Sequence, residues 1–184
     1  MKNLQKIAKN LLIAIGEDPT RIGLKDTPKR MAKMWEEVFK GYDRKQMPNI
    51  TIFPNNKDGV SYNQIIIDKG QFTSHCEHHM ALFKGDYYFG YIPDKYVIGL
   101  SKIGRLVDYY SSRMQIQERL GDDIVSFLYN KLKPRGMILI LKARHTCKEI
   151  RGVKKNGEMI TSVVRGIFET DISAKEEFLQ LIKI

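Results

Sequence analysis

Residues 136–146 read GMILILKARHT, and this stretch decides the class of fold. Its short, strongly apolar run predicts a buried β-strand. Residues 158–170, EMITSVVRGIFET, predict the hairpin partner of that strand, across the turn residues KKNG at 154–157. Because strands joined by a hairpin are antiparallel, the sequence predicts an antiparallel sheet rather than the parallel sheet of alternating strands and helices.

The flanking sequence adds two strands and a set of helices to this hairpin. Residues 62–70 and 81–94 predict strands, and the second alternates in polarity as a half-exposed strand does. Apolar residues at helical spacing, separated by turn residues, predict helices within residues 4–15, 27–39, 99–113, 115–136 and 174–183. This order is typical of an α+β fold, with an N-terminal helical segment at 1–42 and the main domain at 60–184, which together form a single functional domain.

The composition indicates a soluble globular chain. The 184 residues are 42% hydrophobic and 28% charged, and no apolar run approaches the ~20 residues that a membrane span needs. The N-terminus has charges on both sides of its apolar stretch and lacks a small-residue cleavage site, which argues against a signal peptide. We therefore expect a cytoplasmic protein with no membrane partner and with reduced cysteines, so that a metal site is favoured over a disulfide.

The net charge of +10 suggests an anionic partner. Nucleic acid, an anionic lipid and a phosphorylated small molecule would each suit this charge, and so would a solvated basic surface without any partner. The sequence has no long Lys/Arg run, no Arg-Gly repeat and no basic tail. Nucleic acid is therefore the less favoured partner.

All four histidines and both cysteines fall in two short segments, HCEHHM at 75–80 and ARHTC at 143–147. Cys76 and His79 are three residues apart, so a turn at a strand end lets both converge on one ion. Cys147, from another strand, would complete a set of three ligands. Catalytic zinc typically has three protein ligands and keeps one position for water, so the sequence predicts such a site.

The remaining histidines lie close to these ligands. If Cys147 faces the metal from a strand, His145 faces the same cavity, and His78 adjoins the other ligands. Two histidines beside an activated water suit proton transfer. The alternative is a closed structural zinc with His78, His145 or Glu77 as fourth ligand, but the paired Cys-x2-Cys spacing of such sites is absent. We interpret His75 as a neighbour rather than a participant.

Several basic residues could bind an anion near the metal. Ser101 stands at a helix start, with Lys102 and Arg105 one turn apart on one face, and a helix N-terminus with two cations suits a phosphate. A basic helix end without a ligand explains this segment equally well. Arg30 and Arg151 add two guanidinium groups, the preferred forks for phosphate oxygens.

Gln117 and Glu118 stand at the start of a predicted helix, where a glutamate is commonly a partner of the helix dipole. The residues alone favour that reading. Five segments, taken together and in this order, form a more specific pattern: DTPKRMAKMW at 26–35, CEHHM at 76–80, YIPDKYVIGLSKIGRLV at 91–107, QIQERL at 115–120 and HTCKEIRGV at 145–153. In these motifs the chain resembles the GTP cyclohydrolase I family, from about Leu4 to Ile182.

The resemblance implies a role for each candidate residue. The implied ligands of a Zn²⁺ cofactor are Cys76, His79 and Cys147. The implied catalytic residues are His78, His145 and, near the ribose, Ser101. The implied substrate-binding residues are Gln117 and Glu118 at the guanine edge, and Arg30, Lys102, Arg105 and Arg151 at the triphosphate.

The resemblance also implies a fold, an assembly and a reaction. Residues 60–184 would form a catalytic domain with the tunnelling fold, an antiparallel sheet with helices on one face. Subunits would form a pentameric barrel, and two barrels would stack into a homodecamer with active sites between subunits. The zinc-dependent enzyme would convert GTP and water to formate and 7,8-dihydroneopterin triphosphate, the first step of pterin and tetrahydrofolate biosynthesis.

Two rival hypotheses predict different behaviour. A zinc-stabilised interaction module with a basic nucleic-acid face would unfold without its metal. The second rival is a sister enzyme of the same fold. Resemblance to a pyruvoyl-pterin synthase would imply a zinc site of three histidines, and resemblance to a nitrile-reducing enzyme would imply a cysteine nucleophile without zinc. The set of Cys76, His79 and Cys147 argues against both. The chain departs from the family pattern in a shorter N-terminus than some relatives have, in His75, in Arg165 and in few hydroxyl residues over 154–166.

Overall fold

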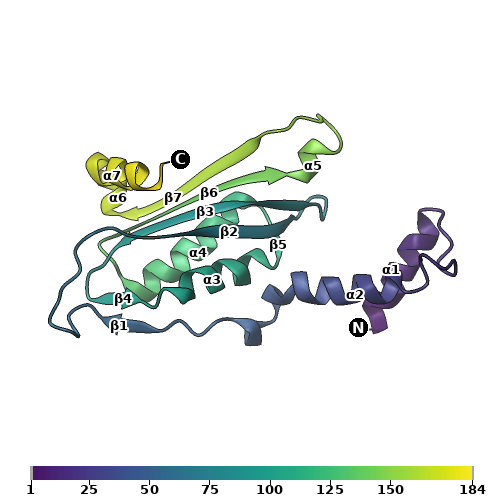
Figure 1. The fold of residues 1–184 in the computed structure, drawn as a ribbon, viewed down its shortest axis with the longest axis horizontal. Coiled ribbons are helices and arrows are strands. Elements are labelled where there is room, and N and C mark those ends of the chain that lie inside the picture. The colour runs from purple at the N-terminus through teal and green to yellow at the C-terminus, as the bar shows by residue number, and fades with distance from the viewer. Residues whose placement is uncertain (1, 184) are drawn as a thin grey trace.

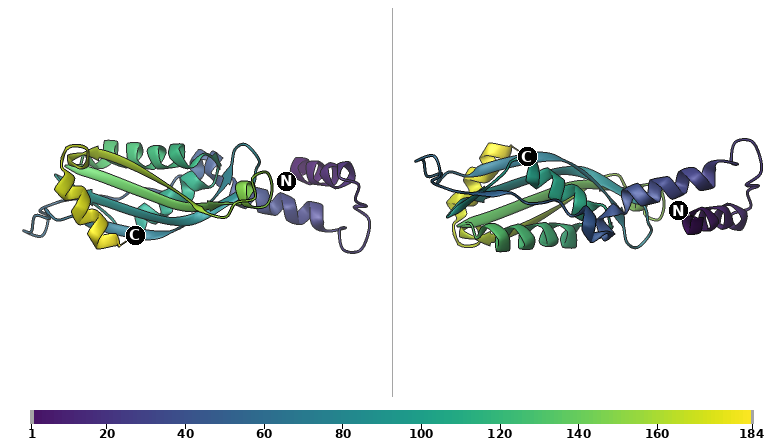
Figure 2. Two further views of the ribbon diagram at one scale, coloured as in Figure 1. Left: turned by 90° about the horizontal axis from the view of Figure 1, so that it is seen from above. Right: turned by 90° about the horizontal axis from the view of Figure 1, so that it is seen from below.

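The computed structural model describes residues 2–183 and shows an α+β fold (Figure 1). Helices α1 (Lys2–Ala14) and α2 (Thr27–Val38) form a hairpin that projects away from the sheet in all views (Figures 1 and 2). Ala32 is fully buried in this hairpin, whereas Ile7 and Leu11 of α1 are 54% and 45% exposed. The hairpin therefore keeps an apolar surface that its own chain does not cover.

One five-stranded sheet forms the centre of the fold. Its order is β5-β2-β3-β6-β7, and neighbours are antiparallel except β2 and β5, which are parallel. A second sheet pairs two short strands, β1 and β4. The strands are β1 (Ile52–Pro54), β2 (Ile66–Cys76), β3 (Leu82–Ile92), β4 (Tyr96–Ile98), β5 (Met114–Gln115), β6 (Gly136–His145) and β7 (Glu158–Gly166). The antiparallel sheet predicted from the apolar run at 136–146 is confirmed.

Helices cover both faces of the sheet, rather than the single face that was expected. Met137, Leu139 and Leu141 of β6 join one core with α3 (Ser101–Ser111) and α4 (Gln117–Leu132). Ile138 and Ile140 point the other way, into a smaller core with α6 (Ile167–Thr170) and α7 (Ile172–Ile182). Because both of its faces are covered, β6 is apolar along most of its length.

The region after β6 differs from the predicted hairpin. The connection to β7 contains a short helix, α5 (Thr146–Glu149), and is longer than the turn KKNG. The second strand ends at Gly166 and residues 167–170 are helical, because Gly166 has a φ of 65° and its N–H donates to Glu169 Oε2. A Cβ on Gly166 would lie 2.4 Å from Arg135 O, so only glycine fits this bend.

Short segments account for the rest of the chain. Two 3₁₀ turns, at Lys40–Tyr42 and Arg44–Gln46, lead from α2 towards β1. The three shortest strands, β1, β4 and β5, were not predicted from the sequence. In the described part of the chain, no helix combines the length and the apolar character of a membrane span.

Candidate active site

A tight turn joins β2 to β3 and carries several of the candidate residues. The backbone N–H groups of His79 and Met80 both donate to the Cys76 carbonyl, at 3.3 and 2.8 Å, and the Cys76 N–H donates to Ala81 O at 2.8 Å. Met80 adopts a left-handed conformation with a φ of 53°, which helps to reverse the chain. The turn brings the His79 ring back to Cys76, as the spacing of these two residues predicted.

Cys147 reaches the same place from the end of β6. The strand ends at His145, and Thr146 Oγ1 donates to Leu82 O at 2.6 Å. The expectation that Cys147 lies on a strand is wrong, because this residue belongs to the first turn of α5. The ladder between β3 and β6 ends with the pair of Phe83 and His145, and Thr146 contacts Leu82 through its side chain instead.

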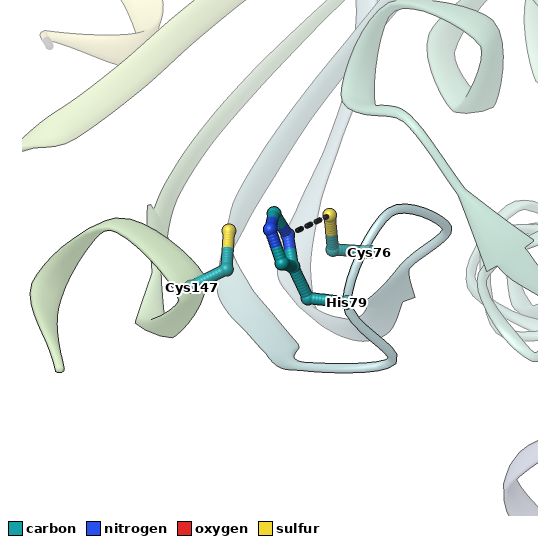
Figure 3. A group of neighbouring side chains, drawn as sticks. All are labelled: Cys76, His79 and Cys147. Atoms are coloured by element: carbon teal, nitrogen blue, oxygen red, sulfur yellow. Dashed lines mark hydrogen bonds between the residues drawn. The ribbon is translucent and has the colours of Figure 1, made fainter. Parts of the chain in front are cut away.

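Cys76, His79 and Cys147 converge on one point (Figure 3). One ligand atom from each residue lies within 4.8 Å of the other two, and Cys76 Sγ is 3.9 Å from His79 Nδ1. Burial raises the pKa of the Cys147 thiol, and the neighbouring Cys76 raises this pKa further. A divalent cation between the two thiols would favour their deprotonated forms, and two thiolates with an imidazole are ligands that zinc prefers. The residues therefore fit a zinc ion.

His145 adjoins this metal-binding group without belonging to it. Its ring stacks on Phe83, with centroids 4.6 Å apart and planes inclined by 4°. Its Nε2 lies 2.9 Å from Oε1 of Gln117. Burial is the largest influence on the pKa of His145 and lowers it, while the nearby Glu118 carboxylate opposes this effect. The two ring contacts fix the position of His145 independently of a metal.

The other residues considered as a fourth ligand have different neighbours. His78 Nδ1 lies 3.6 Å from Cys76 Sγ, but His78 is outside the group whose ligand atoms are mutually within 4.8 Å. The Glu77 carboxylate is ion-paired with Arg119. Arg119 also donates to Gln115 Oε1 at 2.9 Å and so connects the turn to the start of α4. These contacts support a set of three protein ligands.

Arg151 borders the metal-binding group from the loop after α5. Its Nη1 lies 2.8 Å from His79 Nε2. Because a guanidinium only donates hydrogen bonds, this contact needs an Nε2 without a proton. A metal bound at Nδ1, the nitrogen turned towards Cys76, would leave the proton on Nε2 and so release Arg151 from His79. The Arg151 side chain is exposed, so a cation with free donors lies next to the predicted metal site.

The other candidate anion ligands lie elsewhere in the chain. Ser101, Lys102 and Arg105 belong to the first turn and a half of α3. The opposite end of α3 leads into β5, which pairs with Cys76, and a helix of 11 residues is about 16 Å long (Figure 1). Arg30 is exposed on α2, in the projecting hairpin. One chain therefore does not bring these four residues to the metal-binding group.

Three contacts that shape the site had not been singled out from the sequence. They are the stacking of Phe83 on His145, the bond from Thr146 to β3, and the ion pair between Arg119 and Glu77. The last pair is separated by 42 positions, so only the paired strands bring it together. No motif distinguishes Phe83 from the other apolar residues of its strand.

These features define the class of protein: an α+β chain with a three-residue candidate metal centre, bordered by two histidines and an arginine. The family model of GTP cyclohydrolase I matches residues 4–183. The chain therefore belongs to the GTP cyclohydrolase I family, and it is an enzyme of that kind.

Curated relatives agree with this assignment over nearly the whole chain. GTP cyclohydrolase 1 of Helicobacter pylori strain HPAG1 is 41% identical over 170 residues, which cover 92% of this chain and 93% of that protein. GTP cyclohydrolase 1 of Aquifex aeolicus strain VF5 is 40% identical over 184 residues, covering 99% and 96%. Among solved structures, the apo archaeosine synthase QueF-Like is 16% identical with a TM-score of 0.42, over 53% of this chain and 91% of that one.

Proposed function

We propose that this chain is a zinc-dependent hydrolase that converts GTP and water to 7,8-dihydroneopterin triphosphate and formate. The observation that carries the proposal is the convergence of Cys76, His79 and Cys147 beside His145 and Arg151, in a chain of this family. Opening the five-membered ring of guanine at C8 requires an activated water, groups that move protons and a cationic site for the phosphates. Each of these requirements has a candidate residue here.

Cys76, His79 and Cys147 would hold Zn²⁺. When bound, the ion supplies a Lewis acid that lowers the pKa of water to about 7. The three residues lie at one end of a sheet whose main core is formed by buried apolar side chains such as Phe89 and Leu139. Cys76 belongs to this core and Cys147 packs against it, but most of the core consists of apolar side chains that are not ligands. The fold should therefore survive metal removal, which favours a catalytic centre over a zinc-stabilised interaction module.

Histidines and a glutamate would act on the guanine ring. His145, fixed by Phe83 and Gln117, would protonate the ring nitrogen as the ring opens. His78 is exposed beside Cys76 and would exchange protons with water. Glu118 is exposed at the start of α4, close enough to His145 to influence its pKa. Its carboxylate would accept the N1–H and the exocyclic amine of guanine in one bidentate contact.

The triphosphate would bind Arg151 together with residues from other copies of the chain. Those residues are Arg30, Lys102 and Arg105, with Ser101 near the ribose. This sharing is supported by the separation between the start of α3 and the metal-binding group within one chain. A homodecamer of two stacked pentamers, with active sites between subunits, would bring the parts together.

Uncovered surfaces support an assembly of this kind. In the described residues, the outer edge of β7 has no strand partner, and β2 pairs on its outer side only at its last two residues. Unpaired edges of this length are ready to pair with another chain, and a closed barrel would remove them. The exposed Ile7 and Leu11 of α1 offer a further contact between copies.

The cellular setting completes the proposal. Residues 1–42 would act as a helical segment and residues 60–184 as the catalytic domain with the tunnelling fold. Both cysteines are free, and a cytoplasmic location would keep their thiols reduced and available to the metal. The product would be the first intermediate of pterin and tetrahydrofolate biosynthesis.

The proposed reaction can be tested with GTP labelled with ¹³C at C8. We expect labelled formate and a pterin that fluoresces after oxidation, in equal amounts, with neither product from ATP. Lys155→Ala, an exposed change in the loop before β7, serves as a control that should retain activity. Label that remains in the nucleotide, or formate without a pterin, would contradict the proposal.

A further inference from the structure

Gln117 is the first residue of α4, and its side chain is buried, with 1% of the residue exposed. Its amide nitrogen donates to two backbone carbonyls, Leu141 O at 2.9 Å and Met159 O at 3.0 Å, and lies 3.1 Å from Thr161 Oγ1. Carbonyl oxygens only accept hydrogen bonds, so the end of the amide that faces them must be the NH₂ group. The orientation of the Gln117 amide is therefore fixed by β6 and β7.

The amide oxygen of Gln117 consequently points to His145. Its Oε1 lies 2.9 Å from Nε2 of that ring. An amide oxygen only accepts, so Nε2 must carry a proton to bond with it. This holds for the neutral ring and for the imidazolium alike. In the neutral ring, the bond from Nε2 to Gln117 therefore leaves Nδ1 without a proton.

The second ring nitrogen of His145 is the one left for chemistry. Stacking on Phe83 fixes the plane of the ring, and the bond to Gln117 fixes its rotation within that plane. Within residues 2–183, Nδ1 of His145 has no hydrogen-bond partner. This nitrogen is not buried, so another molecule can reach it. A proton given to or taken from another molecule would therefore be exchanged at Nδ1.

We propose that Gln117 is a positioning residue that locks His145 in the tautomer with the proton on Nε2. This assignment replaces the expectation that Gln117 contacts guanine, because the buried amide already uses its NH₂ and its oxygen within the chain. The tautomer follows from the geometry alone. Its value for turnover rests on the proposed function, in which His145 transfers a proton to the substrate.

The tautomer can be observed directly by solid-state ¹⁵N NMR of the full zinc-loaded protein with labelled histidine. The signals of His145 are assigned as those missing in His145→Asn. At a pH where the ring is neutral, we expect the N–H coupling on Nε2 and a bare Nδ1. A proton on Nδ1 with a bare Nε2 would overturn the proposal, whether or not the protein acts on GTP.

Two variants separate the lock from simple packing. Gln117→Met keeps the length but removes the acceptor, so both tautomers should appear and kcat should fall by about 10²-fold, with zinc content and KM nearly unchanged. Gln117→Glu keeps an oxygen that accepts from Nε2, so it should retain the Nε2–H signal. An unchanged His145 signal with normal kcat in Gln117→Met would contradict the lock.

A matched control comes from Asn55, a second buried amide. Asn55 is 6% exposed and also donates to two backbone carbonyls, Tyr62 O at 3.0 Å and Asp94 O at 2.7 Å, but it contacts no histidine in the described residues. Asn55→Leu should lower stability without altering the His145 signals. If it mixes the tautomers as Gln117→Met does, the effect is general loosening and the lock is wrong. If the wild type leaves GTP intact but shows the Nε2–H signal, the proposed function fails and the lock stands.

Discussion

Arg151 Nη1 lies 2.8 Å from His79 Nε2, so a residue expected to bind phosphate touches a residue expected to bind metal. The two residues are 72 positions apart in the chain. Their contact joins the turn after β2 to the loop after α5. A substrate whose ring lies at the metal would therefore place its phosphates on Arg151. The short distance between His79 and Arg151 limits the length of the part of the substrate that joins the ring to the phosphates.

Arg151→Ala tests this relationship. We expect KM for GTP to rise roughly 10- to 100-fold, because a hydrogen bond to a charged group contributes about 1.5–3 kcal/mol. Zinc content should stay at one per chain, since Arg151 is not a ligand. Arg21→Ala is the matched control, because Arg21 is paired with Glu17 on the surface, in the loop between α1 and α2. Equal KM values for the two variants would remove Arg151 from the phosphate site.

Cys147→Ser tests the ligand set. A serine hydroxyl is a poor zinc ligand compared with a thiolate, so we expect loss of both metal and activity. Secondary structure should remain, because Cys147 lies outside the strands. Metal analysis and circular dichroism measure the two effects separately. Full zinc occupancy in this variant would show that other residues hold the metal.

His145→Ala tests proton transfer. The ring lies outside the ligand group, so zinc and GTP binding should persist while kcat falls by about 10²–10⁴-fold. Binding can be followed calorimetrically with the inactive variant. Loss of zinc together with His145 would instead make this residue a ligand, and the site would then be closed rather than open.

The sequence predicted the main strands, the major helices and the metal-binding group, because these depend on local patterns. The apolar run at 136–146 forms strand β6, and Cys76 and His79 belong to one candidate metal-binding group, as their spacing predicted. The sequence could not show where β6 ends, since that depends on the ladder with β3, whose last pair is Phe83 and His145. It also gave no sign that the Gln117 side chain is buried, because that burial depends on the sheet beside the start of α4.

Glu118→Gln tests how guanine is distinguished from adenine. Adenine offers an acceptor at N1 and no amine at C2, so it cannot satisfy the carboxylate that guanine would bind. A site built on such contacts can reject the wrong partner by about 10⁴-fold. We expect Glu118→Gln to lose most GTP turnover while zinc content and affinity for inorganic tripolyphosphate stay close to wild type. Normal turnover of GTP would reduce Glu118 to a partner of the helix dipole.

Coexpression tests whether chains share a site. Cys147→Ser lacks the metal-binding half of the site and Lys102→Ala lacks part of the phosphate half, so each alone should be nearly inactive. If the halves come from different chains, mixed assemblies regain about a quarter of wild-type activity, since a random mixture forms that fraction of intact sites. Separately purified variants mixed without subunit exchange provide the baseline. Absence of any recovery in mixed assemblies would place the whole site in one chain.

The most direct test of the central claim is to measure zinc, formate release from GTP and circular dichroism in one sample before chelation, after chelation and after zinc is returned. We predict one zinc per chain and formate release at the start. After chelation, formate release should stop while the spectrum of secondary structure is unchanged, and zinc should restore activity. Formate release that continues after complete metal removal would contradict a catalytic metal at Cys76, His79 and Cys147, and unfolding on chelation would make the metal structural instead.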